Sequence, residues 1–233
     1  MDALLLDLVK TRKQCQNIAK LGTNYEGSNI MPNDATHLLK QKQFGLRTIN
    51  VPTDLKQVHA LFAKGMAFYS NPLPVQSPLR QMWEAYIPTS IAKDLSNIHQ
   101  VYLQSGGGFW VVVDLNTTSN DIVGCVGCEP LTGGTCELRR MSVSPTVRRR
   151  GLGSLLVRVV EEFAAKHRFT ELILSTGSIM APARGLYERN GFQQYNYEPS
   201  ESKAMMEANE EFGIVHFRKP ITAEKGRWMW SKL

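Results

Sequence analysis

The clearest pattern of apolar and polar positions in this chain lies between residues 152 and 166. Its large apolar side chains recur at the three- and four-residue spacing of one helical face, and they are Leu152, Leu155, Leu156, Val159, Val160 and Phe163. Charged side chains occupy the other side, at Arg158, Glu161, Glu162 and Lys166. The pattern predicts an amphipathic helix with one buried stripe.

Other stretches have the alternating or β-branched character that is typical of strands. They predict strands over 44–51, 108–115, 122–130, 135–143 and 171–176, and two closing strands over 192–197 and 212–219. Helical periods predict helices over 54–69, 79–103 and 180–190, with a kink near Pro88 and a C-terminal cap at Gly191. With an N-terminal helix included, the order is αβααβββαβαββ, a mixed α/β domain without internal repeats.

The strand over 135–143 contains the polar residues of greatest chemical interest. A two-residue period places Glu137, Arg139, Met141 and Val143 on the same face of this strand. We therefore expect the carboxylate of Glu137 to lie on the same side as Met141 and Val143.

The first 42 residues differ from the rest of the chain. Residues 2–20 have a helical period, and residues 21–36 are rich in the Gly, Pro, Asn and Ser of loops and linkers. We expect an N-terminal extension over 1–42 and a single domain over 43–233.

Composition narrows the classes of partner. The 233 residues carry a net charge of +6, which favours anionic partners such as phosphates, nucleic acid or acidic lipid. No secretory signal is evident. No apolar run approaches the roughly 18 residues that a membrane span needs, so we expect no such span.

The number and spacing of the cysteines indicate the redox environment of the protein. Four of them (Cys15, Cys125, Cys128 and Cys136) are too few for a disulfide scaffold in a chain of this length. On a strand Cys125 and Cys128 point to opposite faces, and no His lies near enough in sequence to complete a zinc site. A structural role in the core is favoured over a metal or redox role. We expect no metal and a reduced, intracellular location, the cytoplasm first and the nucleus as an alternative.

The densest basic cluster lies in "SPTVRRRGLG", residues 144–153. It is a solvated charge run, a nucleic-acid contact or a phosphate site. A strand ends before it and a helix begins after it, so unpaired backbone N–H groups and the positive end of the helix dipole meet there. Gly151 and Gly153 let the main chain approach a ligand closely. This setting favours a phosphate site, although no dinucleotide fingerprint or P-loop is present. A nucleic-acid contact is disfavoured because no aromatic residues interleave with the arginines.

Two motifs together resemble the GNAT family of N-acetyltransferases. One is Arg148-x-x-Gly151-x-Gly153, and the other is "ARGLYERNGF" at 183–192. They lie in the family's order, and the ordered resemblance covers residues 44–220. The stretches "ELRRMSVSP", "LSTGS" and "YIPTSIAKDL" are further similar to the N-acetyltransferase 8-like proteins.

The resemblance implies a mixed, largely antiparallel central sheet flanked by helices, and acetyl transfer from acetyl-CoA to a primary amine. It implies that Tyr187 is the acid that protonates the CoA thiolate and that Glu137 is the base. Without the resemblance, Tyr187 is a core or rim residue. Glu137 then forms an ion pair with Arg139 or Arg140, or it lies on a solvated face. The positions along acetyl-CoA are Met141, Ser142, Val143, Arg148, Arg149, Arg150, Gly151, Leu152, Gly153, Ser154 and Ala183. One position departs from the family, because Met180 stands where an Asn is common.

The amine acceptor is expected between the segment 66–95 and the hairpin 193–217. Candidate side chains in the first segment are Met66, Phe68, Tyr69, Trp83 and Tyr86. Lysine, a protein N-terminus, a polyamine and a small amine all stay open as acceptors, and so does the oligomeric state. The competing hypothesis is a non-catalytic acyl-CoA-binding or regulatory module on the same fold.

Overall fold

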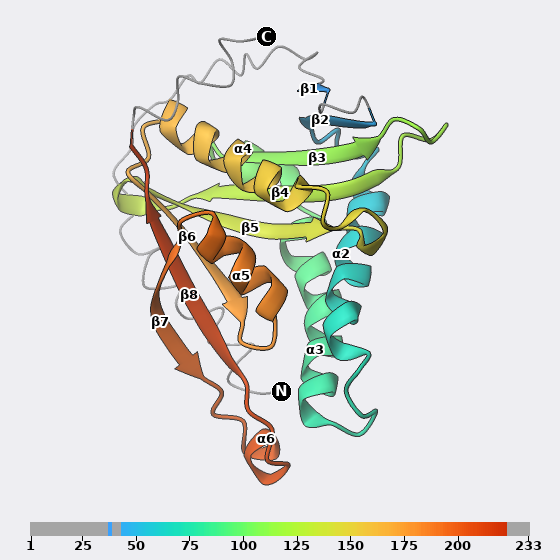
Figure 1. The fold of residues 1–233 in the computed structure, drawn as a ribbon, viewed down its shortest axis with the longest axis vertical. Coiled ribbons are helices and arrows are strands. Elements are labelled where there is room, and N and C mark those ends of the chain that lie inside the picture. Colours follow the sequence, from blue (N-terminus) through green and yellow to red (C-terminus); the bar gives the residue numbers. More distant parts are fainter. Residues whose placement is uncertain (1–36, 39–42, 223–233) are drawn as a thin grey trace.

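The computed structural model describes residues 37–38 and 43–222 (Figure 1). The helix and loop predicted for residues 2–36 lie outside the described residues. The division into a 1–42 extension and a 43–233 domain therefore stays a prediction. Within the described residues, no helix combines the length and the apolar character that crossing a bilayer requires.

The described strands form one eight-stranded sheet in the order β1-β2-β3-β4-β5-β6-β8-β7. The strands are β1 (His37–Leu38), β2 (Phe44–Thr48), β3 (Gly108–Asp114), β4 (Ile122–Pro130), β5 (Thr135–Val143), β6 (Glu171–Gly177), β7 (Gln193–Pro199) and β8 (Gly213–Pro220). Neighbouring strands are antiparallel except β5 and β6, which are parallel. The predicted mixed, largely antiparallel sheet is confirmed.

Helices cover both faces of this sheet (Figure 1). They are α2 (Leu55–Ser70), α3 (Pro78–Ser90), α4 (Leu152–Lys166), α5 (Ala181–Arg189) and the short α6 (Lys203–Glu207), which was not predicted. The helices α4 and α5 pack on one face and α2 and α3 on the other, each with its own apolar core. Pro88 lies inside α3, and the chain widens soon after it into π-helical turns over Ile91–Leu95 and His99–Leu103.

The apolar stripe of α4 forms as predicted. All six of its large side chains are buried, and they meet residues such as Trp110, Leu172 and Phe217 of the sheet. Gly191 takes the left-handed φ of +83° just after α5, as expected of a C-terminal cap.

A β-bulge in β5 overturns the prediction made from its two-residue period. Between the pairs Cys125–Ser142 and Gly127–Arg139 one residue of β4 faces two of β5, and Arg140 has a φ of +53°. The extra residue reverses the alternation. Met141 and Val143 pack against the core beneath α4, whereas Glu137 and Arg139 lie on the face of α2 and α3. The expectation that Glu137 shares a face with Met141 and Val143 is wrong.

The same strand separates from its parallel neighbour. The pairing of β5 with β6 is limited to three positions, from Thr135–Glu171 to Glu137–Ile173. Beyond Glu137 the two strands diverge, which Figure 1 shows as an opening in the middle of the sheet. The edge of β5 that faces this opening has no strand partner among the described residues.

A buried ion pair holds the bulge in place. Asp94, in the first π-helical turn, is fully buried and accepts hydrogen bonds from Nε and Nη2 of Arg140 at 2.8 and 2.7 Å. Tyr102 donates to the same carboxylate at 2.5 Å. Burial alone would raise the pKa of Asp94, but Arg140 and then Arg139 outweigh it and lower that pKa.

We expect Asp94→Asn to lower the free energy of unfolding by about 3–5 kcal/mol, because it leaves the buried guanidinium of Arg140 without its counter-charge. Glu84→Gln is the control, since it breaks only the exposed i,i+4 pair with Arg80 and should cost under about 0.5 kcal/mol. Denaturant titration measures both values.

The same pair predicts a pH dependence. A carboxyl whose pKa is lowered by folding stabilises the fold above its unfolded pKa and loses that contribution as the pH falls through its folded pKa. The difference between wild type and Asp94→Asn should therefore be constant above about pH 5 and shrink only below the ordinary value of 3.8. A difference that is already small at neutral pH would contradict this account of the bulge.

Candidate active site

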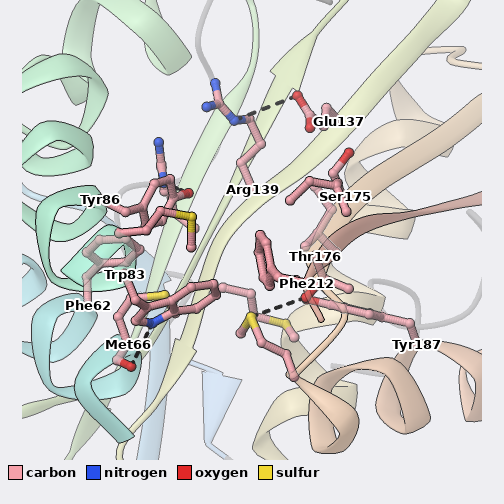
Figure 2. A pocket seen from close by; sticks show the side chains of 17 residues that line it. Phe62, Met66, Trp83, Tyr86, Glu137, Arg139, Ser175, Thr176, Tyr187 and Phe212 are labelled. Atoms are coloured by element: carbon pink, nitrogen blue, oxygen red, sulfur yellow. Dashed lines mark hydrogen bonds and ion pairs between the residues drawn. The ribbon is translucent and has the colours of Figure 1, made fainter. Parts of the chain in front are cut away.

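A cavity lies where β5 and β6 diverge. It encloses about 980 Å³ of empty space, including the part that is open to solvent. Figure 2 shows side chains from both faces of the sheet pointing toward it. Its lining residues are Phe62, Met66, Met82, Trp83, Tyr86, Glu137, Leu138, Arg139, Arg140, Met141, Ser175, Thr176, Gly177, Met180, Tyr187, Phe212 and Ile214.

One wall of the cavity is aromatic. The ring of Trp83 lies 6.0 Å from that of Tyr86 and 5.7 Å from that of Phe212, which it meets edge to face. Trp83 is fixed by a hydrogen bond from its Nε1 to the carbonyl of Met66 at 2.9 Å. Because α2, α3 and β8 each contribute to this wall, it forms only in the folded chain.

The opposite wall carries charges that are already paired. Arg139 forms an ion pair with Glu129, its Nε lies 3.7 Å from Oε2 of Glu137, and its Nη2 lies 3.8 Å from Oδ2 of Asp94. Arg140 is held by the same Asp94. The two arginines that line the cavity are thus paired with carboxylates, of which Glu137 alone also lines it.

Tyr187 reaches the cavity from α5. Its ring is buried against Phe192 and Phe217, with centroids 5.8 and 6.0 Å away. Burial, and to a smaller degree the nearby Tyr69, raises the pKa of Tyr187 above its ordinary value of 10.0. The hydroxyl is therefore neutral at physiological pH and is a proton donor.

The loop before α4 has the shape of an anion site. Gly151 has a φ of +83°, the left-handed conformation that favours glycine, and a Cβ added there would meet nothing within 4 Å. Arg149 and Arg150 are exposed beside it. No side chain caps the start of α4, so its first backbone N–H groups are available to an anionic ligand.

The three arginines have different surroundings. The guanidinium of Arg148 stacks 4.2 Å above the ring of Phe68, and its Nε donates to the carbonyl of Val143 at 3.3 Å. Arg150 donates to the side chain of Gln43 at 2.7 Å. The charge of Arg148 therefore lies between α2 and the loop, beside the opening in the sheet.

The helices α4 and α5 touch beside this loop. A Cβ on Gly153 would meet the side chain of Leu186 at 2.9 Å, so the absence of a side chain lets α5 approach. Asn190 donates to the hydroxyl of Ser154 at 3.1 Å. This contact sets the distance between the loop and Tyr187 on α5.

The sequence profile of the Acetyltransferase (GNAT) family matches residues 76–192, a stretch that runs from α3 to the end of α5 and includes the opening and the loop. The chain belongs to the GNAT family.

Other GNAT proteins extend this result. Human N-acetyltransferase 8 is 32% identical over 121 residues, 49% of this chain and 52% of that protein. The chain spans about half the length of the curated relatives it matches. A GNAT acetyltransferase from Staphylococcus aureus shares the fold with a TM-score of 0.57, at 18% identity over 77% of this chain and 99% of that one. A phosphinothricin acetyltransferase from Sinorhizobium meliloti, solved in complex with AcCoA, has a TM-score of 0.54 at 15% identity, over 77% and 89% of the two chains.

Several residues that the GNAT resemblance singled out lie together around the opening. Glu137, Met141 and Tyr187 line the cavity, and Met180 lies there too, as the acceptor of a hydrogen bond from Thr176 at 3.3 Å. Ala183 packs beside the core under α4.

Two of the predicted positions along acetyl-CoA have their side chains elsewhere. Leu152 is buried in the core, and Ser142 is buried facing α2, where its hydroxyl lies 3.6 Å from a Cβ built on Gly65. Only the backbone of these two residues is available to a ligand in the opening.

The predicted acceptor region is partly right. Met66, Trp83 and Tyr86 line the cavity, whereas Phe68 and Tyr69 stack beside Arg148 and do not line it. Phe212 and Ile214 also line the cavity, and they belong to the hairpin 193–217 that was predicted to border the acceptor site. The sequence did not identify Ser175 and Thr176 as site residues. The sequence of a short strand does not show where that strand separates from its neighbour, so these two residues could not be placed at the opening.

The three cysteines among the described residues, Cys125, Cys128 and Cys136, are core residues. Cys125 belongs to the core under α2 and α3 and Cys128 to the core under α4, so they face opposite sides of the sheet as predicted. Burial raises the pKa of the Cys125 thiol to about 12. None of the described cysteines lines the cavity.

We expect Gly151→Asp to weaken acetyl-CoA binding at least tenfold more than Gly151→Asn, a difference of about 1.4 kcal/mol. Both side chains have the same size, and both residues tolerate a positive φ, so the comparison isolates the negative charge. Isothermal titration calorimetry on the folded variants measures the two affinities. Equal affinities would exclude a phosphate group at this loop.

Proposed function

We propose that this protein is an acetyltransferase that moves an acetyl group from acetyl-CoA directly to a primary amine. The observation that carries the proposal is the convergence of three features on one opening in the sheet. They are the unpaired edge of β5, the uncapped start of α4 and the neutral hydroxyl of Tyr187. The match to the GNAT family supports the same donor.

Each feature has a separate task in this proposal. The backbone of the loop from Arg148 to Ser154 holds the pyrophosphate at the helix N-terminus. The backbone of β5 from Met141 to Val143 extends along the pantetheine arm and polarises the thioester carbonyl. Arg148 adds positive charge beside this path.

The chemical step needs two proton movements. The acceptor arrives as an ammonium and must lose a proton before its nitrogen forms a bond to the carbonyl carbon. As the carbon–sulfur bond breaks, the phenol of Tyr187 donates its proton to the leaving sulfur. The amide then sheds its second proton, so one proton reaches solvent for each acetyl group transferred.

The cavity wall supports direct transfer and a particular kind of acceptor. Because no described cysteine lines the cavity, transfer through an acyl-cysteine has no support there. Aromatic and thioether side chains form most of the acceptor side, and the two arginines are already paired with carboxylates. A primary amine with an apolar body fits this wall, and its ammonium has the carboxylate of Glu137 and the aromatic rings as partners.

An alkylamine series tests the reaction and the acceptor together. Each methylene buried against the aromatic wall should stabilise the complex by about 0.8 kcal/mol, which is a rise of about fourfold in kcat/KM for each methylene added from propylamine to hexylamine. Amines of equal length that end in a hydroxyl group are the controls, and their kcat/KM should be lower. Release of free CoA thiol measures the rate.

The outcomes of this series separate the hypotheses. A protein that binds acetyl-CoA but releases no CoA thiol with any amine would be a non-catalytic acyl-CoA-binding module. Activity that is independent of chain length would support the acetyltransferase function but exclude an acceptor with an apolar body.

Removal of the Tyr187 hydroxyl should affect chemistry alone. We expect Tyr187→Phe to lower kcat by roughly 10²–10⁴-fold, the usual contribution of a positioned acid. The ring contacts with Phe192 and Phe217 remain, so the melting temperature and the acetyl-CoA affinity should stay unchanged. Near-normal kcat in this variant would make Tyr187 a core residue.

A further inference from the structure

A polar side chain stands on β6 at the point where the sheet opens. Ser175 lies two residues beyond Ile173, the last residue of β6 that pairs with β5, and on the same face of the strand. It is exposed and lines the cavity, and Figure 2 shows it beside Glu137, on the same side of the opening as Thr176 and Tyr187. An acceptor nitrogen in the cavity has access to this hydroxyl.

The hydroxyl of Ser175 contacts a buried imidazole. His216 pairs with Ser175 across β6 and β8, and its Nδ1 lies 2.9 Å from Oγ of Ser175. The side chain of His216 is almost inaccessible, with 8% of the residue exposed. Its Nε2 is buried and makes no hydrogen bond with any described residue.

A carboxylate faces the other nitrogen of this imidazole. Oε1 of Glu198, on β7, lies 3.2 Å from Nε2 of His216, close enough to stabilise a positive charge on the ring without forming an aligned hydrogen bond. The side-chain amide of Asn196 donates to the same oxygen at 3.3 Å. Three neighbouring strands thus align a hydroxyl, an imidazole and a carboxylate, starting at the cavity.

We propose that Ser175 and His216 form the proton relay that deprotonates the acceptor amine, with Glu198 positioning and stabilising His216. The inference rests on the proposed acetyl transfer. The tautomer of His216 that carries its proton on Nε2 leaves Nδ1 as an acceptor. Oγ of Ser175 then takes a proton from the ammonium while its own proton passes to Nδ1, and His216 becomes an imidazolium beside Glu198.

The proton balance of the relay is complete. The neutral amine forms the new carbon–nitrogen bond, and the phenol of Tyr187 supplies the proton to the CoA sulfur. The amine nitrogen loses its second proton as the amide forms. This proton and the one on the imidazolium of His216 restore the phenol of Tyr187 and release one proton to solvent in each cycle. No oxidant, reductant or further reactant is required.

Glu137 is the competing base, and its surroundings favour a different role. Its carboxylate forms an ion pair with Arg139, whose Nε lies 3.7 Å from Oε2. At the cavity wall it attracts the ammonium of the acceptor. The relay removes the proton.

Other charged and titratable groups surround the imidazole. From β7, Glu198 contacts it and the ring of Tyr195 lies 5.9 Å away. Arg218 follows on the same face of β8 and stacks over Tyr195. Glu137 of β5 and Glu171 of β6 also interact electrostatically with Tyr195. Because several charged groups surround the imidazole, the pH profile of the wild type must be compared with the profiles of the relay variants.

The experiment compares two amines that differ in basicity. Hexylamine is protonated at neutral pH and needs a base, whereas trifluoroethylamine is already largely neutral and does not. We expect Ser175→Ala and His216→Asn to lower kcat/KM for hexylamine by about 10²-fold at neutral pH. The loss should shrink as the pH rises, and it should stay below about threefold for trifluoroethylamine, within the range of small positioning effects.

Controls separate proton transfer from folding. Ser175 is exposed, so Ser175→Ala should fold normally, and Ser119→Ala in the exposed β3–β4 turn should change neither substrate's kinetics. Acetyl-CoA affinity should be the same in all variants. Glu198→Gln should reduce the hexylamine rate less than His216→Asn does, because it weakens only the stabilisation of the imidazolium.

Each outcome supports or overturns the relay. Equal losses with both amines would overturn it, since a structural defect does not depend on the basicity of the substrate. Loss of the acidic limb of the pH–rate profile in Glu137→Gln, with Ser175→Ala unaffected, would make Glu137 the base. A wild-type protein that acetylates no amine would overturn the proposed function and the relay with it. An active wild type with unchanged relay variants would overturn the relay alone.

Discussion

The ion pair between Asp94 and Arg140 is the contact on which the active side of this fold depends. It holds Arg140 in a left-handed conformation in the middle of a strand, where the extra residue of the bulge reverses the faces of β5. The separation of β5 from β6 begins just before the bulge, beyond Glu137, and the opening between the two strands becomes the cavity. A buried charge pair adds little net stability to a fold, but its geometry is strict. Here the geometry determines which side chains of β5 point to each face beside the opening.

The sequence was sufficient to predict those features that depend on residues close together along the chain. The stripe of α4, the cap at Gly191 and the glycines of the loop before α4 each follow from side chains that are close along the chain. The bulge could not be predicted in the same way, because an arginine has no intrinsic preference for a positive φ. Its partner Asp94 lies 46 residues earlier, on a helical segment whose packing the sequence does not state.

In the candidate site, too, some residues could be predicted from the sequence and others could not. Tyr187 was found from a short motif, since a helix start, a tyrosine and a closing glycine keep fixed spacings. Ser175 and His216 are 41 residues apart and meet only through the register of β6 and β8. Register depends on the whole sheet, and a one-residue slip would turn His216 to the other face. Single residues of ordinary type on exposed strands give no warning of such a contact.

The opening between β5 and β6 connects the two faces of the sheet, and this has a consequence for the order of events in a catalytic cycle. The loop before α4 lies on one face of the sheet and the aromatic wall of α2 and α3 on the other, so in the proposed reaction the two substrates meet at the opening from different faces. Neither has to leave before the other arrives. Such an architecture favours a ternary complex, with intersecting double-reciprocal plots, over a ping-pong cycle in which the enzyme itself carries the acetyl group.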